Sequence, residues 1–382
     1  MTPPQPPPPQ PGRLGDRTMS LLRDPRTHPK VLSTLSLFGL DKSFADEPAH
    51  IHRSDPLEKK LDYVANFEAG VLGFYDVVPI ELPADGEKKR GEGEEEEVGV
   101  RYWTERIIGV DGNEIVLHLF RPVVGDGGGL LPCVVYIHGG AMTIGTTYNR
   151  LHKKWCESLA LSGLVVIAID FRNAYNAREK KLDAFPAGLN DVGSGVAWID
   201  ARREELGITK IVLEGESGGG NLCLATALKA KRDGRLGMID GVYALVPCIS
   251  GDAYAWDEGR KVAELPSLVE CDGYFLSCRQ LDLLAGFYDP SGEHGENPLA
   301  WPLYAEEEEL VGLPPHVVSV DELDPLRDEG KAYFRKLLRA GVEARGRVNL
   351  GIPHGMEFLL RQAIPQVYKA TVADIKEFAY SV

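Results

Sequence analysis

The chain has 382 residues, of which 43% are apolar and 26% charged, and its formal net charge at pH 7 is −15. This acidity argues against nucleic acid or an anionic membrane surface as a partner, because both select clustered lysine and arginine. No apolar run comes near the roughly 20 residues that cross a bilayer, and the first residues lack the basic and apolar regions of a secretory signal. We therefore expect no membrane span and a cytoplasmic location.

The N-terminal part of the chain is expected to lie outside the main domain. Residues 1–12 are mostly proline and glutamine, a composition that favours extended polyproline II and buries no core. We expect a disordered tail there, with a ligand for a proline-binding module as the alternative. Residues 13–99 begin with helical, partly apolar sequence and end in a run of charge and glycine at 84–99, which predicts a solvated acidic loop.

Residues 100–382 carry the pattern of a mostly parallel sheet with helices on both faces. Two strand-like stretches flank Asp111 and Gly112, a dipeptide typical of tight hairpin turns. Apolar runs then alternate with helical stretches, and several runs lack polar alternation, as expected of strands that are covered on both faces. The sequence thus predicts a doubly wound α/β domain, with strands at 133–139, 164–171, 210–216, 240–247, 316–322 and 343–350.

The stretch 251–310 interrupts this alternation of strands and helices. It is rich in aromatic, charged and leucine residues, and it is too long for an ordinary loop in a compact domain. We expect it to form an inserted helical lid that covers the functional site together with part of the segment 13–99, so that both segments contribute to a cap.

A glycine cluster between a strand and a helix, in "KIVLEGESGGGNLCLATALKAK" (210–231), is the main candidate for chemistry. Gly215, Ser217 and Gly219 satisfy G-x-S-x-G, the nucleophile elbow, in which serine sits at a strained turn and the glycines let strand and helix meet. A phosphate-binding loop is excluded, because no lysine–hydroxyl pair follows the glycines and Glu216 would repel a phosphate. Ser217 is therefore the candidate nucleophile, with a purely structural glycine turn as the alternative.

Serine attacks only after a base takes its proton, so this chemistry requires a histidine in a loop after a late strand. His354 lies in such a loop, although an isolated polar loop histidine would look the same. A carboxylate must orient this histidine, and Asp324 lies at the carboxyl end of a strand, where open α/β sheets carry their sites. Pro325 also makes Asp324 a candidate helix N-cap, and Asp328 is expected to point elsewhere. The chain order Ser217, Asp324, His354 is that of an α/β-hydrolase.

An oxyanion hole is an independent requirement of this chemistry. Attack on an ester carbonyl creates an alkoxide, which backbone N–H groups stabilise. Gly218, the residue after the serine, is one expected donor, and Gly139 and Gly140 of an early H-G-G sequence are the others, because glycine lets bare backbone approach a substrate. His138 is expected to shape this loop rather than to act as a base.

The ordered set of motifs resembles that of one family, the hormone-sensitive-lipase-like carboxylesterases of the α/β-hydrolase superfamily. H-G-G at 138–140 resembles its H-G-G-G, "GESGGGN" its G-D-S-A-G-G-N, and "DPLRDEG" and "HGM" its last two motifs; "DFRNA", "FPAGLND" and "NPLAWPLYA" resemble segments between them. The match covers roughly residues 100–380. The resemblance implies an α/β-hydrolase fold with a helical cap. The site residues it implies are Ser217, Asp324 and His354 as the triad and Gly139, Gly140 and Gly218 as the oxyanion donors.

By this resemblance the protein is expected to be a carboxylic ester hydrolase that cleaves short- to medium-chain acyl esters through an acyl-enzyme, without cofactor or metal. Its expected partner is a small-molecule ester, and a homodimer is expected from the resemblance alone. An amidase or peptidase on the same scaffold and a non-catalytic small-molecule receptor are the alternatives. Ala141, Glu216 and Gly218 replace the family's glycine, aspartate and alanine, and they leave the triad complete.

Overall fold

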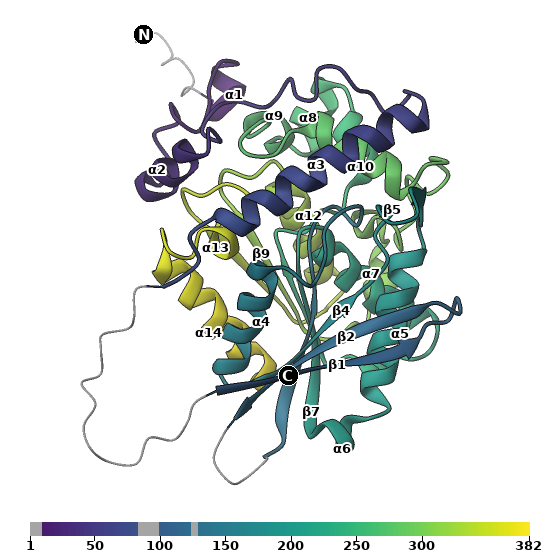
Figure 1. Cartoon of the computed structure of the whole chain (residues 1–382). Coiled ribbons are helices and arrows are strands. Elements are labelled where there is room, and N and C mark those ends of the chain that lie inside the picture. Colours follow the sequence, from purple (N-terminus) through teal and green to yellow (C-terminus); the bar gives the residue numbers. More distant parts are fainter. Residues whose placement is uncertain (1–9, 83–98, 124–128) are drawn as a thin grey trace, which may run out of the picture.

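In the computed structural model, which describes residues 10–82, 99–123 and 129–382, one sheet of eight strands runs through the molecule in the order β1-β2-β4-β3-β7-β8-β9-β10 (Figure 1). Strands β1 and β2 pair antiparallel, as do β2 and β4, and the other neighbours pair parallel. The predicted mostly parallel sheet is therefore confirmed. The predicted hairpin turn joins β1 to β2, and Gly112 has the positive φ (+80°) of such turns. The strands are β1 (Gly99–Ile108), β2 (Glu114–Val123), β3 (Leu131–Ile137), β4 (Val165–Asp170), β7 (Ile208–Glu216), β8 (Gly241–Leu245), β9 (His316–Asp321) and β10 (Ala344–Asn349).

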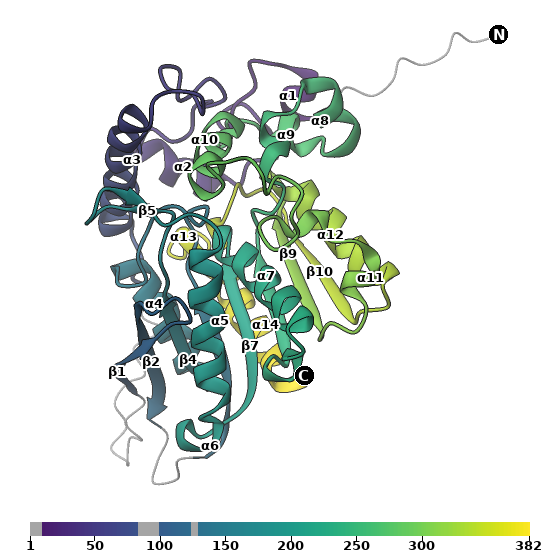
Figure 2. The same cartoon turned by 90° about the vertical axis from the view of Figure 1, so that its right-hand side faces the viewer.

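Helices cover both faces of this sheet (Figures 1 and 2). On one face lie α5 (Ala187–Asp200), α7 (Gly218–Arg232) and α12 (Arg327–Arg339), and on the other lie α4 (Arg150–Leu161) and α14 (Pro365–Ser381). Each face has its own apolar core. Along β3, Val135 packs into the core beneath α5, α7 and α12, and Val134 packs into the core beneath α4 and α14. Burial on both sides explains why this strand shows no polar alternation. The shorter elements are β5 (Tyr175–Asn176), β6 (Lys181–Leu182), α6 (Arg203–Leu206), α11 (Glu307–Leu310) and α13 (Met356–Leu359).

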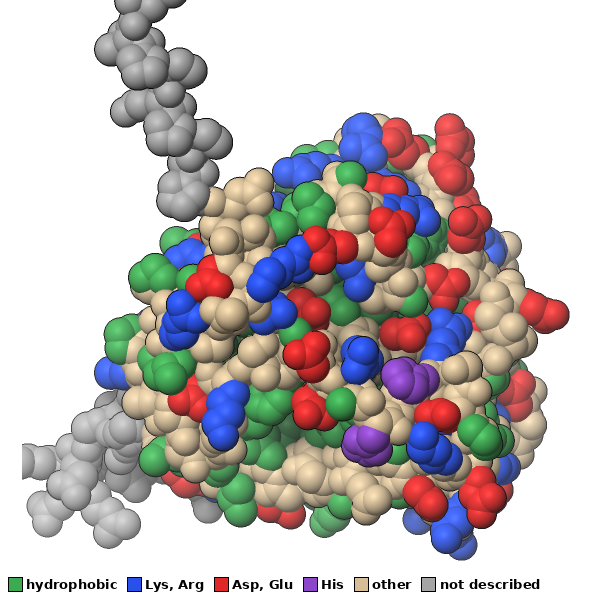
Figure 3. All heavy atoms as spheres, turned by 90° about the horizontal axis from the view of Figure 1, so that it is seen from above, with side chains coloured by type: hydrophobic (Ala, Val, Ile, Leu, Met, Phe, Trp, Pro, Cys, Tyr) green, Lys and Arg blue, Asp and Glu red, His purple; other side chains and the backbone are tan. Residues whose placement is uncertain are grey.

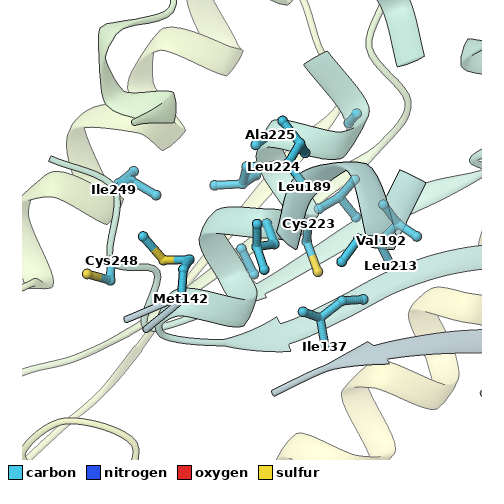
Figure 4. Close-up of a cluster of buried hydrophobic side chains, with 14 of the residues drawn as sticks. Ile137, Met142, Leu189, Val192, Leu213, Cys223, Leu224, Ala225, Cys248 and Ile249 are labelled. Atoms are coloured by element: carbon cyan, nitrogen blue, oxygen red, sulfur yellow. The ribbon is translucent and has the colours of Figure 1, made fainter. Parts of the chain in front are cut away.

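The core on the α5 and α7 face joins these helices to the strands beneath them (Figure 4). Ile137 at the end of β3 and Leu213 of β7 share this core with Leu189 of α5 and Cys223 of α7, and all four side chains are buried. Helix α7 is buried along most of its length, which explains its run of small and apolar residues. Packing on several sides therefore positions the first turn of α7, which directly follows Ser217.

A layer of helices lies beyond the carboxyl ends of the parallel strands, and two distant parts of the chain contribute to it (Figures 1 and 2). One part comes from the N-terminal segment and the other from the stretch after β8. An isolated antiparallel β-bridge between Ser43 and Tyr274 links them, as does a hydrogen bond of 3.1 Å from Gln280 Nε2 to the hydroxyl of Tyr63. We call this layer the upper helical layer. It comprises α1 (Gly12–Gly15), α2 (Pro29–Leu37), α3 (Leu57–Val77), α8 (Glu258–Glu264), α9 (Ser267–Glu270) and α10 (Cys278–Tyr288).

Seen from above, the upper helical layer presents acidic and basic side chains interspersed with apolar ones (Figure 3). Among the described residues, no helix combines the length and the apolar character of a membrane span. The division of the chain into a tail, an N-terminal segment and a catalytic domain with an insertion remains a prediction. The expected disordered tail and acidic loop fall almost wholly on residues 1–9 and 83–98, which lie outside the described residues.

Candidate active site

Ser217 holds an unusual backbone conformation at the turn between β7 and α7. Its φ is +56° and its ψ is −116°, and for a residue with a Cβ such regions cost about 1–3 kcal/mol unless the surroundings enforce them. Here strand β8 and the loop after it do so, because the Ser217 amide donates to the Leu245 carbonyl at 2.8 Å and the Ser217 carbonyl accepts from the Cys248 amide at 3.1 Å. This is the backbone geometry expected of a nucleophile elbow.

The glycines around Ser217 are required by close backbone contacts. A Cβ on Gly219 would lie 1.9 Å from the carbonyl oxygen of Ile137, and one on Gly215 would lie 2.5 Å from the same atom. Both positions therefore exclude a side chain, as the G-x-S-x-G pattern predicts. A Cβ on Gly218 would lie 2.8 Å from the amide nitrogen of Ala141. Glycine at 218, where the related family has alanine, thus follows from the close approach of the loop after β3.

Asp324 and His354 form a buried hydrogen-bonded pair. Nδ1 of His354 lies 2.8 Å from Oδ2 of Asp324, and both residues are buried. The other oxygen of Asp324 accepts from the Leu326 amide at 2.9 Å. Because α12 begins only at Arg327, Asp324 caps the preceding turn rather than the helix itself. Asp328 instead hydrogen-bonds to Arg327, so it points away from the histidine.

The three candidate catalytic residues follow strands whose carboxyl ends meet at one edge of the sheet. Ser217 follows β7, Asp324 follows β9 and His354 follows β10, and β8 lies between β7 and β9. The structure brings Asp324 and His354 into contact. Ser217 Oγ makes no hydrogen bond within the described residues, so its link to His354 remains a proposal.

The loop after β3 differs from the predicted oxyanion hole at one position. The amide of Gly139 donates to Oε1 of Glu216 at 2.7 Å, so it is not free to bind an oxyanion. The amides of Gly140, Ala141 and Gly218 have no acceptor among the described residues. Gly139 therefore leaves the predicted set of donors and Ala141 becomes a candidate. Sequence reasoning missed Ala141 because it looked for glycine, whereas Ala141 adopts the left-handed region (φ +53°) despite its Cβ.

Glu216, which directly precedes Ser217, contacts this loop through its side chain. Its Oε1 also accepts from the Tyr136 hydroxyl at 3.0 Å, and Nε2 of His152 lies 3.6 Å from it. Burial raises the pKa of Glu216 to about 8 and lowers the pKa of His152 well below its usual value. Both side chains are therefore uncharged near neutral pH. In the sequence, the sign that Glu216 is buried next to the loop is its position as an acidic residue at the end of an apolar strand.

The loop that carries His354 also rests on buried carboxyl groups. Oδ2 of Asp321 accepts from the Gly355 amide at 2.8 Å, and the Asn349 side chain donates to Asp321 at 2.9 Å and to Glu357 at 3.3 Å. Burial and the neighbouring Glu357 raise the pKa of Asp321 well above its usual value. These carboxyl groups do not make a metal site: in the part of the chain that the structure describes, no group of three or more His, Cys, Asp or Glu side chains is arranged to hold a metal ion.

Comparison with known proteins identifies relatives across most of the chain. The family described as the α/β-hydrolase fold matches residues 134–358. A solved structure of brefeldin A esterase, described as a bacterial homologue of human hormone-sensitive lipase, superimposes with a TM-score of 0.90 and 49% identity, covering 97% of this chain and 98% of that one. An arylesterase of Saccharolobus solfataricus is 31% identical over 243 residues, 62% of this chain and 70% of the arylesterase. Gibberellin receptor GID1A of Arabidopsis thaliana is 28% identical over 240 residues, 60% of this chain and 63% of the receptor.

Proposed function

Because the chain belongs to the α/β-hydrolase family and is a carboxylic ester hydrolase, we propose that it hydrolyses esters with Ser217 as nucleophile, His354 as general base and Asp324 as the residue that orients the histidine. One observation carries this proposal. The Nδ1–Oδ2 distance of 2.8 Å between His354 and Asp324 occurs at the sheet edge that also carries the strained Ser217 turn. A histidine held by a buried carboxylate beside an elbow serine has the parts that acyl transfer needs.

The proposed reaction proceeds through an acyl-enzyme. Nε2 of His354 takes the proton from Ser217 Oγ while Oγ attacks the ester carbonyl carbon, and Asp324 stabilises the imidazolium that forms. The tetrahedral intermediate collapses, the C–O bond to the alcohol breaks, and His354 returns the proton to the departing alkoxide. Water then attacks the acyl group with the same histidine as base, which releases the acid and restores Ser217.

Three backbone amides would stabilise the oxyanion in both tetrahedral intermediates. We assign them to Gly140, Ala141 and Gly218, because these amides are unpaired in the described residues, whereas Gly139 is bound to Glu216. Each such donor contributes about 3 kcal/mol of transition-state stabilisation in well-studied hydrolases. Position 141 thus contributes through its backbone, which is consistent with alanine in place of the family's glycine.

The proposed substrates are esters of short- to medium-chain acids. Ser217 is partly buried and lies at the sheet edge that the upper helical layer covers (Figure 2), so a substrate has to fit between the sheet and these helices. An arylesterase among the relatives extends the proposal to aryl esters. A series of p-nitrophenyl esters of increasing acyl length tests the preference directly, with kcat/KM expected to fall for long chains. A homodimer and a cytoplasmic location stay predictions from the sequence.

The likeness to a gibberellin receptor favours one alternative, a protein that binds a small molecule without chemistry. Binding alone does not need a general base, whereas this chain has a buried His354–Asp324 pair. A fluorophosphonate probe distinguishes the two functions, because only an activated serine reacts with it. An amidase would react as well, and matched ester and anilide substrates separate it from an esterase.

The decisive experiment is Ser217→Ala with p-nitrophenyl butyrate as substrate. We expect kcat to fall about 10³-fold or more, since removal of a triad member leaves only the contributions of binding and the oxyanion hole. Ser319→Ala is the matched control, because Ser319 is a fully buried serine of β9 whose hydroxyl has no hydrogen-bond partner among the described residues. Near wild-type turnover by Ser217→Ala would overturn the proposed function.

A further inference from the structure

Glu216 connects the serine turn to the loop that carries the proposed oxyanion donors, two parts of the site whose relative position matters for catalysis. It ends β7 and directly precedes Ser217, so its backbone belongs to the serine turn. Its Oε1 accepts the Gly139 amide at 2.7 Å and the Tyr136 hydroxyl at 3.0 Å. Tyr136 lies near the end of β3 and Gly139 in the loop that follows it, which we call the oxyanion loop (residues 138–145). One carboxyl oxygen thus ties the serine turn to both the strand and the loop beside it.

The contact between Glu216 and the oxyanion loop is close at Gly139 and leaves little room for a side chain there. A Cβ on Gly139 would lie 3.0 Å from the backbone oxygen of Glu216 and 3.2 Å from its Oε1. The Gly139 amide is directed at Glu216. The chain then turns through three consecutive residues of positive φ, Gly140 (+105°), Ala141 (+53°) and Met142 (+56°). Because the direction of one peptide group constrains the next, the bond at Gly139 also sets the direction of the unpaired amides that follow it.

No positive charge balances Glu216 in the described part of the chain. Its nearest cationic candidate, Nε2 of His152, lies 3.6 Å away on a side chain that burial keeps neutral, and Oε2 of Glu216 has no hydrogen-bond partner among the described residues. Burial raises the pKa of Glu216 to about 8. The titratable groups that face it from the surrounding elements are Glu214, Tyr136, His152, Cys156, Cys223, Glu357 and Tyr75.

We propose that Glu216 is a positioning residue for ester hydrolysis: as an uncharged carboxylic acid it holds the Gly139 amide and thereby aims the amides of Gly140 and Ala141 at the carbonyl oxygen of an ester on Ser217. This inference rests on the proposed function. The uncharged state matters because a carboxylate one residue from Ser217 would oppose the negative charge that develops on the oxyanion in the transition state.

The test compares two substitutions of similar size. Glu216→Gln keeps an oxygen that accepts from Gly139, whereas Glu216→Met keeps the length of the side chain and removes the acceptor. With p-nitrophenyl butyrate we expect kcat within about twofold of wild type for Glu216→Gln and a fall of about 10- to 100-fold for Glu216→Met, with KM nearly unchanged, since small misplacements of catalytic groups cost this much. Equal kcat values for the two variants would overturn the proposal.

Active-site titration with a fluorophosphonate separates this inference from the proposed function. Rates are expressed per labelled Ser217, so a fraction of misfolded Glu216→Met does not lower the apparent kcat. If wild-type Ser217 does not react, the proposed function fails; if it reacts and Glu216→Met retains full kcat, only the role of Glu216 fails. Glu214→Gln is the matched control, because Glu214 is buried on the same strand and its side chain accepts a hydrogen bond from Trp155, which lies outside the oxyanion loop.

A pH profile tests the uncharged state. In wild type we expect kcat to fall as pH rises through about 8, the pKa of Glu216, because ionisation places a negative charge beside the oxyanion. This fall should be absent from Glu216→Gln, which cannot ionise, and should persist in Glu214→Gln. An unchanged alkaline fall in Glu216→Gln would overturn the requirement for an uncharged acid.

Discussion

The chain buries two clusters of carboxyl groups that differ in charge. The first, the β7 cluster, consists of Glu214 and Glu216, of which Glu216 holds the oxyanion loop and Glu214 binds Trp155. In the described part of the chain no arginine or lysine forms an ion pair with either of them, and burial raises the pKa of both, that of Glu216 to about 8. The second, the seam cluster, consists of Glu270 of α9 and Asp328 of α12, both buried and both bound by Arg327.

Ion pairs keep the seam cluster charged. Arg327 lies 2.8 Å from Glu270 and 3.1 Å from Asp328, and Arg26 lies 2.6 Å from Glu270. Burial alone would raise the pKa of Asp328, but the hydrogen bonds and charge of Arg327 outweigh it and lower this pKa to about 2. Since Arg26 comes from the N-terminal part of the chain and Glu270 from α9, these ion pairs join the upper helical layer to α12, which packs on the sheet.

The difference between the clusters shows that the presence of a cationic partner, rather than burial itself, decides whether a buried carboxyl group is charged. Beside Ser217 an uncharged acid still accepts hydrogen bonds and adds no negative charge near the reacting carbonyl. At the seam, paired charges supply directional contacts between segments that are distant in sequence. The same residue type therefore serves catalytic geometry in one place and segment docking in the other.

The largest effect on stability is expected when the seam cluster loses its cation. Arg327→Met leaves two buried carboxylates without their main partner, and breaking a buried ion pair in this way destabilises proteins by about 3–5 kcal/mol. The free energy of unfolding is measured by urea denaturation. Arg339→Met, at the exposed end of the same helix, breaks the pair with Glu307 and should cost about 1 kcal/mol or less. Equal losses in the two variants would contradict the importance of the seam.

A somewhat smaller effect is expected in the pH dependence of stability, with opposite signs for the two clusters. The pKa of Glu216 is raised from 4.5 to about 8, so between these values the folded state holds a proton that the unfolded state lacks. Its stabilisation is therefore complete below pH 4.5 and is lost as pH rises through 8. From pH 5 to 8 we expect wild type to lose about 3 kcal/mol relative to Glu216→Gln.

Asp328 supplies the opposite case. Its pKa is lowered from 3.8 to about 2, so its stabilisation is complete above pH 3.8 and is lost as pH falls through 2. Asp328→Asn should therefore differ from wild type most at neutral pH, and the difference should shrink in acid. Urea denaturation at several pH values measures both variants, and slopes of the same sign would contradict the assigned charge states.

The smallest effect is expected at Glu68 of α3. This carboxyl group is less buried than those of either cluster. This half-buried carboxyl accepts from the Gly145 amide at 2.9 Å and so connects the upper helical layer to the oxyanion loop. Glu68→Ala removes one hydrogen bond, worth about 1 kcal/mol, and Glu68→Gln retains the acceptor. We expect a small loss of stability and a reduction of kcat of only a few fold in Glu68→Ala, measured by urea denaturation and p-nitrophenyl ester turnover. A loss as large as that of Glu216→Met would show that the α3 contact, rather than Glu216, holds the loop.

The sequence by itself determined the sheet and the conformation of the serine turn. Continuous apolar runs predict strands covered on both faces, and the structure has them as β3, β4, β7, β8 and β9. The glycines at 215 and 219 predict a turn with no room for a Cβ, and in the structure a Cβ added at either position would lie within 2.5 Å of the carbonyl oxygen of Ile137. These features are readable because they depend on local periodicity and on the covalent limits of glycine.

Only the tertiary structure decided which amides are free and which acids are charged. The Gly139 amide is removed from the oxyanion donors by a side chain 77 positions away, and Glu270 is kept ionised by Arg26 and Arg327, which lie 244 and 57 positions away. Neither outcome follows from local sequence, because the direction of an N–H group and the pKa of a carboxyl group depend on which distant atoms the fold brings within about 3 Å. Glycine at 139 therefore reads as an oxyanion donor in the sequence and proves to be a close contact of Glu216 in the fold.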